Sequence, residues 1–138
     1  MGMDSKQQSK IVTVRSPNTV HTQQGLPYFV GLSEDTAGTK GISMNLVVIP
    51  PGATAKAHIH KTFETGIYVL EGRVETRYGD NLEHSVINQA GDFVFIPPDL
   101  LHRPTNLNAD APAKAIVVRN DANEFEDVIV PDDFAEAC

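Results

Sequence analysis

Short runs rich in Val, Ile, Phe and Tyr recur along this 138-residue chain, separated by Pro, Gly, Asn and Asp. Strands at regular short spacing with turn residues between them are typical of an all-β sandwich or barrel. The expected strands lie at residues 11–14, 27–32, 41–49, 57–60, 65–70, 73–78, 84–87, 93–96, 102–107, 114–119 and 127–130. The only segment with a possible helical period is the acidic DDFAEA near the C-terminus.

The length predicts a single domain, because 138 residues are enough for one hydrophobic core and too few for two. We expect a disordered polar segment at residues 1–10, one barrel domain at 11–131 and an acidic tail at 132–138. Within the barrel, Glu and Arg alternate from residue 71 to residue 77. Alternate residues of a strand share a face, so this pattern predicts a solvated face with opposite charges side by side.

The formal net charge of -7 argues against nucleic acid or an anionic membrane surface as a partner, since both require a basic face. The only cysteine, Cys138, cannot form an internal disulfide. The first ten residues lack the apolar core of a secretory signal, and no apolar run reaches the ~18 residues of a membrane span. The sequence therefore predicts a cytoplasmic protein with no nucleic-acid or membrane partner.

Three titratable residues, His58, His60 and Glu64, lie within seven residues ahead of an apolar run. Residues i and i+2 of a strand point to the same face, so both imidazoles could reach one ion. The alternative is a set of unrelated polar residues on a solvated edge. A second segment favours the metal site, because His102 opens a strand after the Pro97-Pro98 turn and adds a third imidazole.

Two segments carry these residues in a fixed order. The first holds Gly52, His58, His60, Glu64 and Gly72, and the second holds Gly91, Pro97, His102 and Asn106. In this order and at this spacing they resemble the two motifs of the cupin family. The resemblance covers most of the chain and implies a cupin-type double-stranded β-helix, a jelly-roll barrel of antiparallel strands. It also implies a site in which His58, His60, Glu64 and His102 hold one divalent transition metal ion, as Mn, Fe, Ni or Zn.

The chain departs from the family pattern at two places. Asp99 stands where the second motif has a glycine, and Asp tolerates the left-handed backbone that such a turn requires. Seven residues separate Glu64 from Gly72 where the family has six. In a regular strand the extra residue would turn Glu64 to the opposite face, and a bulge near Thr65-Gly66 would restore it. Without the carboxylate, the site would hold three histidines completed by water.

Other residues are weaker candidates for the pocket. Lys56 has the same parity as His58 and could face an anionic substrate, with a solvated lysine as the alternative. Tyr68 and Phe95 are candidates for the pocket wall, and Phe63 and Phe93 for the barrel interior. Two further histidines, His21 and His84, have no partner at ligand spacing and are interpreted as ordinary strand or surface residues.

Two functions remain open at this point. The first is a metal-dependent enzyme acting on a small molecule with paired oxygens, as a dioxygenase, decarboxylase or isomerase, and the open coordination positions favour it. The second is a non-catalytic module that binds a metal or small ligand as a sensor. The family resemblance also implies a homodimer that covers exposed strand edges.

Overall fold

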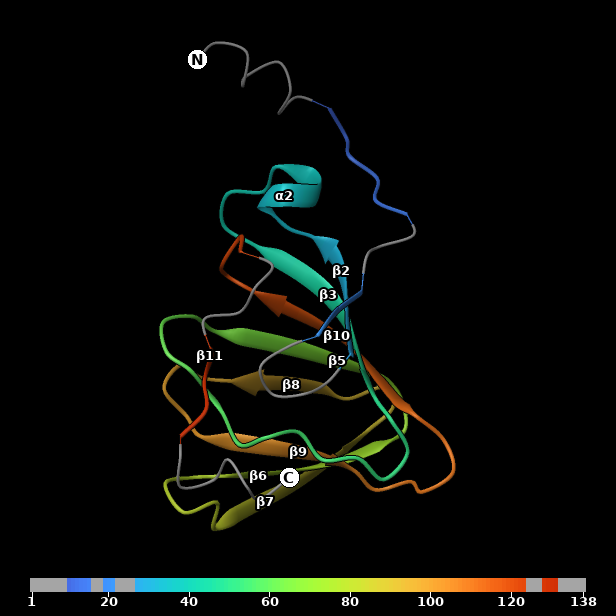
Figure 1. Cartoon of the computed structure of the whole chain (residues 1–138), viewed down its shortest axis with the longest axis vertical. Helices are drawn as coiled ribbons and strands as arrows, with labels where there is room; N and C mark the ends of the chain where they lie inside the picture. Colours follow the sequence, from blue (N-terminus) through green and yellow to red (C-terminus); the bar gives the residue numbers. More distant parts are fainter. Residues whose placement is uncertain (1–9, 16–18, 22–26, 124–127, 132–138) are drawn as a thin grey trace.

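The computed structural model describes residues 10–15, 19–21, 27–123 and 128–131, and antiparallel β-strands are its main regular structure (Figure 1). Six strands form one sheet in the order β1-β2-β3-β10-β5-β8, three form a second in the order β7-β6-β9, and β4 pairs with β11. The strands are β1 (Thr19–His21), β2 (Pro27–Leu32), β3 (Ser43–Ile49), β4 (Ile59–His60), β5 (Thr65–Glu71), β6 (Arg73–Tyr78), β7 (His84–Gln89), β8 (Phe93–Ile96), β9 (His102–Asn106), β10 (Ala113–Arg119) and β11 (Val128–Ile129). The all-β prediction is confirmed.

The expected strands are present with small shifts at their ends, except the first. Residues 11–14 form no strand, and Ile11 is 97% exposed. Instead, β1 pairs with β2, so the outer edge of β2 already has a partner. The polar segment 1–9 and the acidic tail 132–138, with its candidate helix, lie outside the described residues.

One short helix, α2 (Glu34–Ala37), was not expected from the sequence. Its four residues are too few to show a helical hydrophobic period. The sequence features that mark this helix are its capping residues. The Ser33 hydroxyl accepts from the backbone N–H of Thr36, the Thr36 hydroxyl accepts from that of Ser33, and Gly38 ends the helix at φ 75°. Among the described residues, no helix is long and apolar enough to cross a membrane.

The hydrophobic core lies between the six-stranded sheet and the three-stranded sheet. Every second residue of β3 is buried, as the two-residue period of a strand requires. Buried apolar residues from β2, β3, β10 and the segment before β4 form one cluster: Tyr28, Val47, Ile49, Ala55, Ala113 and Val117. Val74 of β6 packs against this cluster from the other sheet. In Figure 1, β2, β3, β10, β5 and β8 follow one another down the view, with β9, β6 and β7 below them.

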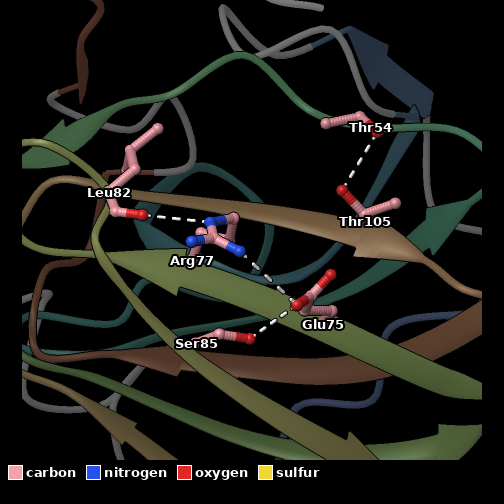
Figure 2. A network of polar contacts seen from close by, with 6 residues as sticks. All are labelled: Thr54, Glu75, Arg77, Leu82, Ser85 and Thr105. Atoms are coloured by element: carbon pink, nitrogen blue, oxygen red, sulfur yellow. Dashed lines mark hydrogen bonds and ion pairs between the residues drawn. The ribbon is translucent and has the colours of Figure 1, made fainter.

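The outer face of β6 carries a network of polar contacts (Figure 2). Arg77 lies 3.9 Å from the Glu75 carboxylate, which also accepts a 2.6 Å hydrogen bond from the Ser85 hydroxyl. The Arg77 Nε donates to the Leu82 carbonyl at 3.0 Å. Both charged side chains are partly exposed, so the pair stabilises the fold by less than ~1 kcal/mol. This arrangement agrees with the solvated face expected from the sequence.

Gly72, between β5 and β6, has a backbone that other residues rarely adopt. Its φ is 95°, and an added Cβ would lie 2.9 Å from the Ala113 Cβ. Both the left-handed backbone and the close approach therefore require glycine.

We expect Gly72→Ala to lower the free energy of unfolding by about 1–3 kcal/mol, the usual cost of a strained backbone. The measurement is urea denaturation. Gly66→Ala is the matched control in the neighbouring strand, because an added Cβ there meets nothing within 4 Å and φ is not positive. Equal effects of the two substitutions would contradict this account.

Candidate metal centre

The three histidines of the two sequence motifs meet at one place inside the fold. His60 ends β4, His102 begins β9, and His58 lies just before β4. The backbones of His58 and His102 exchange two hydrogen bonds of 3.0 Å, so the two residues lie directly opposite each other. The ring centroids are 4.3 to 5.2 Å apart, and the possible ligand atoms all lie within 4.8 Å of one another.

Hydrogen bonds orient the rings of His58 and His102. The Nδ1 of His58 lies 2.7 Å from the Lys56 carbonyl, and the Nδ1 of His102 lies 2.8 Å from the Leu100 carbonyl. A carbonyl oxygen only accepts, so each Nδ1 must carry the proton and each Nε2 keeps its lone pair. Histidines that bind metals commonly donate their second ring nitrogen in this way, which fixes the tautomer and the ring direction.

All three imidazoles are held neutral. Burial is the main cause, and it lowers the pKa of His58 to about 4 and those of His60 and His102 to about 3, from an ordinary value of 6.5. The neighbouring histidine lowers each pKa further, because two imidazolium ions would repel each other. At neutral pH the rings therefore offer lone pairs, which is the state that binds a divalent metal.

The histidines line a cavity of about 90 Å³ between the two sheets. Most of its wall is apolar and comes from Val47, Ile49, Ile67, Val69, Val74, Val94, Ile96, Pro104, Ala115 and Val117. The remaining polar residues of the wall are Thr65, Thr76, Asn88 and Arg119. The site thus combines a cluster of nitrogen donors with a small, largely apolar chamber.

The turn before His102 has the geometry expected of it. Asp99 has a φ of 67°, so it adopts the left-handed backbone that the family's glycine would supply. Its N–H donates to the His60 carbonyl at 2.8 Å and thereby ties the turn to β4. The prediction that Asp99 serves in this turn is confirmed.

The structure does not place Glu64 with the histidines. Glu64 is exposed just before β5, whereas Thr65, Ile67 and Val69 point into the cavity. The bulge that would have turned Glu64 inward is not at Thr65-Gly66, where β5 pairs regularly with β10. The irregularity lies at the other end, where Lys114 pairs with Glu71 and Ala115 with Val69.

Thr65 takes the inward position predicted for Glu64. It is 2% exposed and lines the cavity with the histidines. The sequence held a signal for it: counting back from Gly72 with the family spacing of six residues ends at Thr65. Glu64 has the ligand side chain of the family pattern, but Thr65 occupies the position.

The weaker pocket candidates also lie elsewhere. Lys56 is exposed and contributes its carbonyl to His58, and its side chain is not part of the cavity wall. Tyr68 and Phe95 lie on the outer face, because they alternate with the inward residues Ile67, Val94 and Ile96. Phe93 is likewise outside, at 84% exposed. These positions correct the prediction that Tyr68 and Phe95 line the pocket.

Two further residues, Phe63 and Arg119, lie close to the histidines. Phe63 is buried, with its ring 5.2 Å from that of His60, as expected for an interior residue. Arg119, at the end of β10, was not proposed from the sequence, although it lines the cavity. The sequence of β10 carries no motif that would single out Arg119. Its position at the cavity follows from the pairing of β10 with β5, which places Arg119 opposite Thr65.

Comparison with known families agrees with the two motifs. The family model described as "Cupin domain" matches residues 45–119, more than half of the chain. The chain belongs to the cupin family. The matched segment contains all three histidines as well as Thr65 and Arg119. No curated protein matches the sequence.

Solved structures show the same fold. An oxalate oxidase in complex with the substrate analogue glycolate matches with a TM-score of 0.67 and 24% identity, covering 88% of this cupin and 62% of that chain. The oxalate decarboxylase formate complex of Lactobacillus farciminis matches with a TM-score of 0.68 and 19% identity, covering 83% of this chain and 33% of that one. Peruvianin-I, a cysteine peptidase from Thevetia peruviana latex, matches with a TM-score of 0.65 and 20% identity, covering 85% of this chain and 72% of that one. This cupin therefore spans less than two thirds of the two oxalate enzymes.

The lowered pKa values predict how stability depends on pH. Below pH 6.5 the unfolded chain binds protons that the folded metal-free protein does not bind until about pH 3 to 4. The free energy of unfolding should therefore fall as the pH drops from 6.5, by up to ~1.4 kcal/mol per pH unit for each histidine. Denaturation between pH 7 and pH 5 measures this slope.

His102→Gln should make the slope shallower, because one titrating group is lost. His84→Gln is the control, since His84 is exposed beside Glu83 and outside the cluster. Identical slopes in the wild type and the His102 variant would contradict the buried neutral state.

Proposed function

We propose that this cupin binds one divalent transition metal ion through His58, His60 and His102 and acts on a small oxygen-bearing molecule in the adjoining cavity. The observation that supports this is the convergence of three buried, neutral imidazoles on one wall of the chamber. Imidazole donors suit Fe, Ni or Zn, and Mn would depend more on oxygen donors such as water or the bound molecule. Three protein ligands leave coordination positions for water and for a bound molecule.

A bound divalent ion would supply Lewis acidity to an oxygen of that molecule. The chain itself contributes two further features: the Lys56 and Leu100 carbonyls orient the rings of His58 and His102, and a largely apolar wall surrounds the rest of the chamber. Since Glu64 lies outside, neutral donors would leave the full charge of the ion to attract an anion. Dioxygenase, decarboxylase and isomerase chemistry all fit such a site.

A second function, a non-catalytic metal or small-ligand module, is favoured by one observation. Among the described residues, the cavity wall contains no Asp, Glu, Lys, Tyr or Cys, so general acid–base chemistry has no group besides the histidines. An enzyme should consume a bound compound at a rate that depends on the metal supplied. A sensor should bind the compound and release it unchanged, and product analysis distinguishes the two.

The metal site itself can be tested by elemental analysis and calorimetry. We expect about one ion per chain, and a loss of affinity on the order of 100-fold or more in His58→Ala, His60→Ala and His102→Ala, because each removes a direct ligand. Glu64→Ala and His84→Ala should bind as the wild type does, since both side chains are exposed. Retention of full affinity in the three histidine variants would refute the site.

We also propose that two copies pair through the outer face of the six-stranded sheet. Here Tyr68, Phe93, Phe95, Ile116 and Val118 form an uncharged groove, and β8 ends the sheet. Exposed aromatic residues on an edge strand favour association. Chains of net charge -7 repel one another, so an uncharged face is the most favourable place for a second copy.

Sedimentation should give a species of twice the 15.0 kDa chain mass. Phe93→Glu should produce the monomer, because it places an acid from each copy in the contact. Ile87→Glu, on an exposed residue of β7 in the three-stranded sheet, should leave the mass unchanged. A wild-type monomer at micromolar concentration would contradict the pairing.

A further inference from the structure

A buried threonine faces the cavity beside the histidine cluster. Thr65 is 2% exposed and begins β5, and it lines the cavity together with the three histidines. Phe63, two residues earlier in the chain, packs its ring 5.2 Å from that of His60. The start of β5 is therefore next to the cluster, and the inward residues Ile67 and Val69 continue the wall along the strand.

The hydroxyl of Thr65 has no hydrogen-bond partner among the described residues, although its Oγ1 is buried. Buried polar atoms are nearly always paired, and an unpaired one retains the cost of its desolvation. A hydroxyl in this state next to a cluster of ligand atoms indicates that its partner arrives with a bound molecule.

The other polar side chains of the described wall differ from Thr65. Arg119 lies opposite it and already donates to the Tyr28 hydroxyl. Thr76 and Asn88 belong to the three-stranded sheet, and both are partly exposed. Of the two threonines in the described wall, Thr65 is therefore the one whose hydroxyl is cut off from bulk solvent.

The volume of the cavity limits which molecules can supply that partner. An apolar cavity of ~150 Å³ accommodates a benzene ring. The cavity here measures about 90 Å³, which leaves room for a body on the order of four to five non-hydrogen atoms and excludes an aromatic ring. Because most of the wall is apolar, the part of the molecule that points away from the histidines should be hydrocarbon.

We propose that the Thr65 hydroxyl donates a hydrogen bond to a short aliphatic molecule that carries two adjacent oxygens, with those oxygens toward the histidines. This names the class of the small molecule and so rests on the proposed function. A glutamate at this position would add a negative charge and an oxygen ligand of its own. Threonine leaves the ligand oxygens to the bound molecule and offers them a donor.

Calorimetry with two hydroxamates on the cobalt-loaded protein tests the proposal. Acetohydroxamate and benzohydroxamate present the same pair of oxygens, the first on a methyl group and the second on an aromatic ring. Acetohydroxamate should bind roughly 10-fold more tightly or better, because the ring exceeds the space beside the histidines. The cobalt absorption spectrum shows whether the ion stays in the protein when the hydroxamate binds.

Thr65→Val keeps the branched shape of the side chain and removes only the hydroxyl. It should weaken acetohydroxamate binding by about 5- to 20-fold, the usual effect of losing one hydrogen bond, and leave cobalt affinity within about twofold of the wild type. Without hydroxamate, the variant should unfold at an equal or higher urea concentration, since an unpaired buried hydroxyl opposes folding. A purely structural role would lower stability instead.

Thr105→Val is the matched control. Thr105 lies in β9 outside the cavity wall, and its hydroxyl is 3.0 Å from that of Thr54 (Figure 2). This substitution should show the opposite pattern, with lower stability and unchanged hydroxamate affinity, because it removes a paired hydroxyl that does not face the cavity.

The outcomes separate this proposal from the metal site. Unchanged acetohydroxamate affinity in Thr65→Val, with cobalt bound as in the wild type, would overturn the role of Thr65 and leave the metal site intact; this result is expected if the hydroxyl pairs only with a buried water. Benzohydroxamate binding as tight as that of acetohydroxamate would overturn the aliphatic class. A large loss of cobalt affinity in Thr65→Val would assign the hydroxyl to the ion and also contradict the proposal. If the wild type takes up no cobalt, the proposed function fails, and this proposal fails with it.

Discussion

The two-residue period of the β-strand is the constraint on which the site depends. Along β5 it directs Thr65, Ile67 and Val69 into the cavity and Tyr68 to the outside. A change of register by one residue would exchange these two faces completely. The bulge near Leu70 therefore matters, because it takes up the extra residue of this chain at the far end of β5 and leaves the pairing next to the histidines regular.

The histidine cluster depends equally on a contact between segments distant in sequence. The mutual backbone hydrogen bonds of His58 and His102 bring the two motifs to one point. Burial there makes a charged imidazole unfavourable, and it thereby keeps the lone pairs available. The same burial that opposes protonation thus keeps the rings in the state that the proposed metal ion requires. The carbonyls of Lys56 and Leu100 fix the tautomers of His58 and His102.

The cavity has an unusual balance of charge for an apolar chamber. Its histidines are neutral, its one described arginine is fixed by Tyr28 and Phe63, and the acidic residue nearest in sequence, Glu64, is outside. Although the overall charge of the protein is -7, the side chain of Arg119 is buried.

The sequence by itself determined the all-β class, most strand positions and the three histidines, because alternation, turn residues and motif spacing are local signals. It also indicated that Asp99 could adopt a left-handed turn. The tertiary structure decided what local patterns leave open: whether Glu64 or Thr65 faces inward, and that Arg119 reaches the cavity. Those outcomes depend on where a bulge falls and on which strands pair, and both are settled by contacts between residues far apart in the chain.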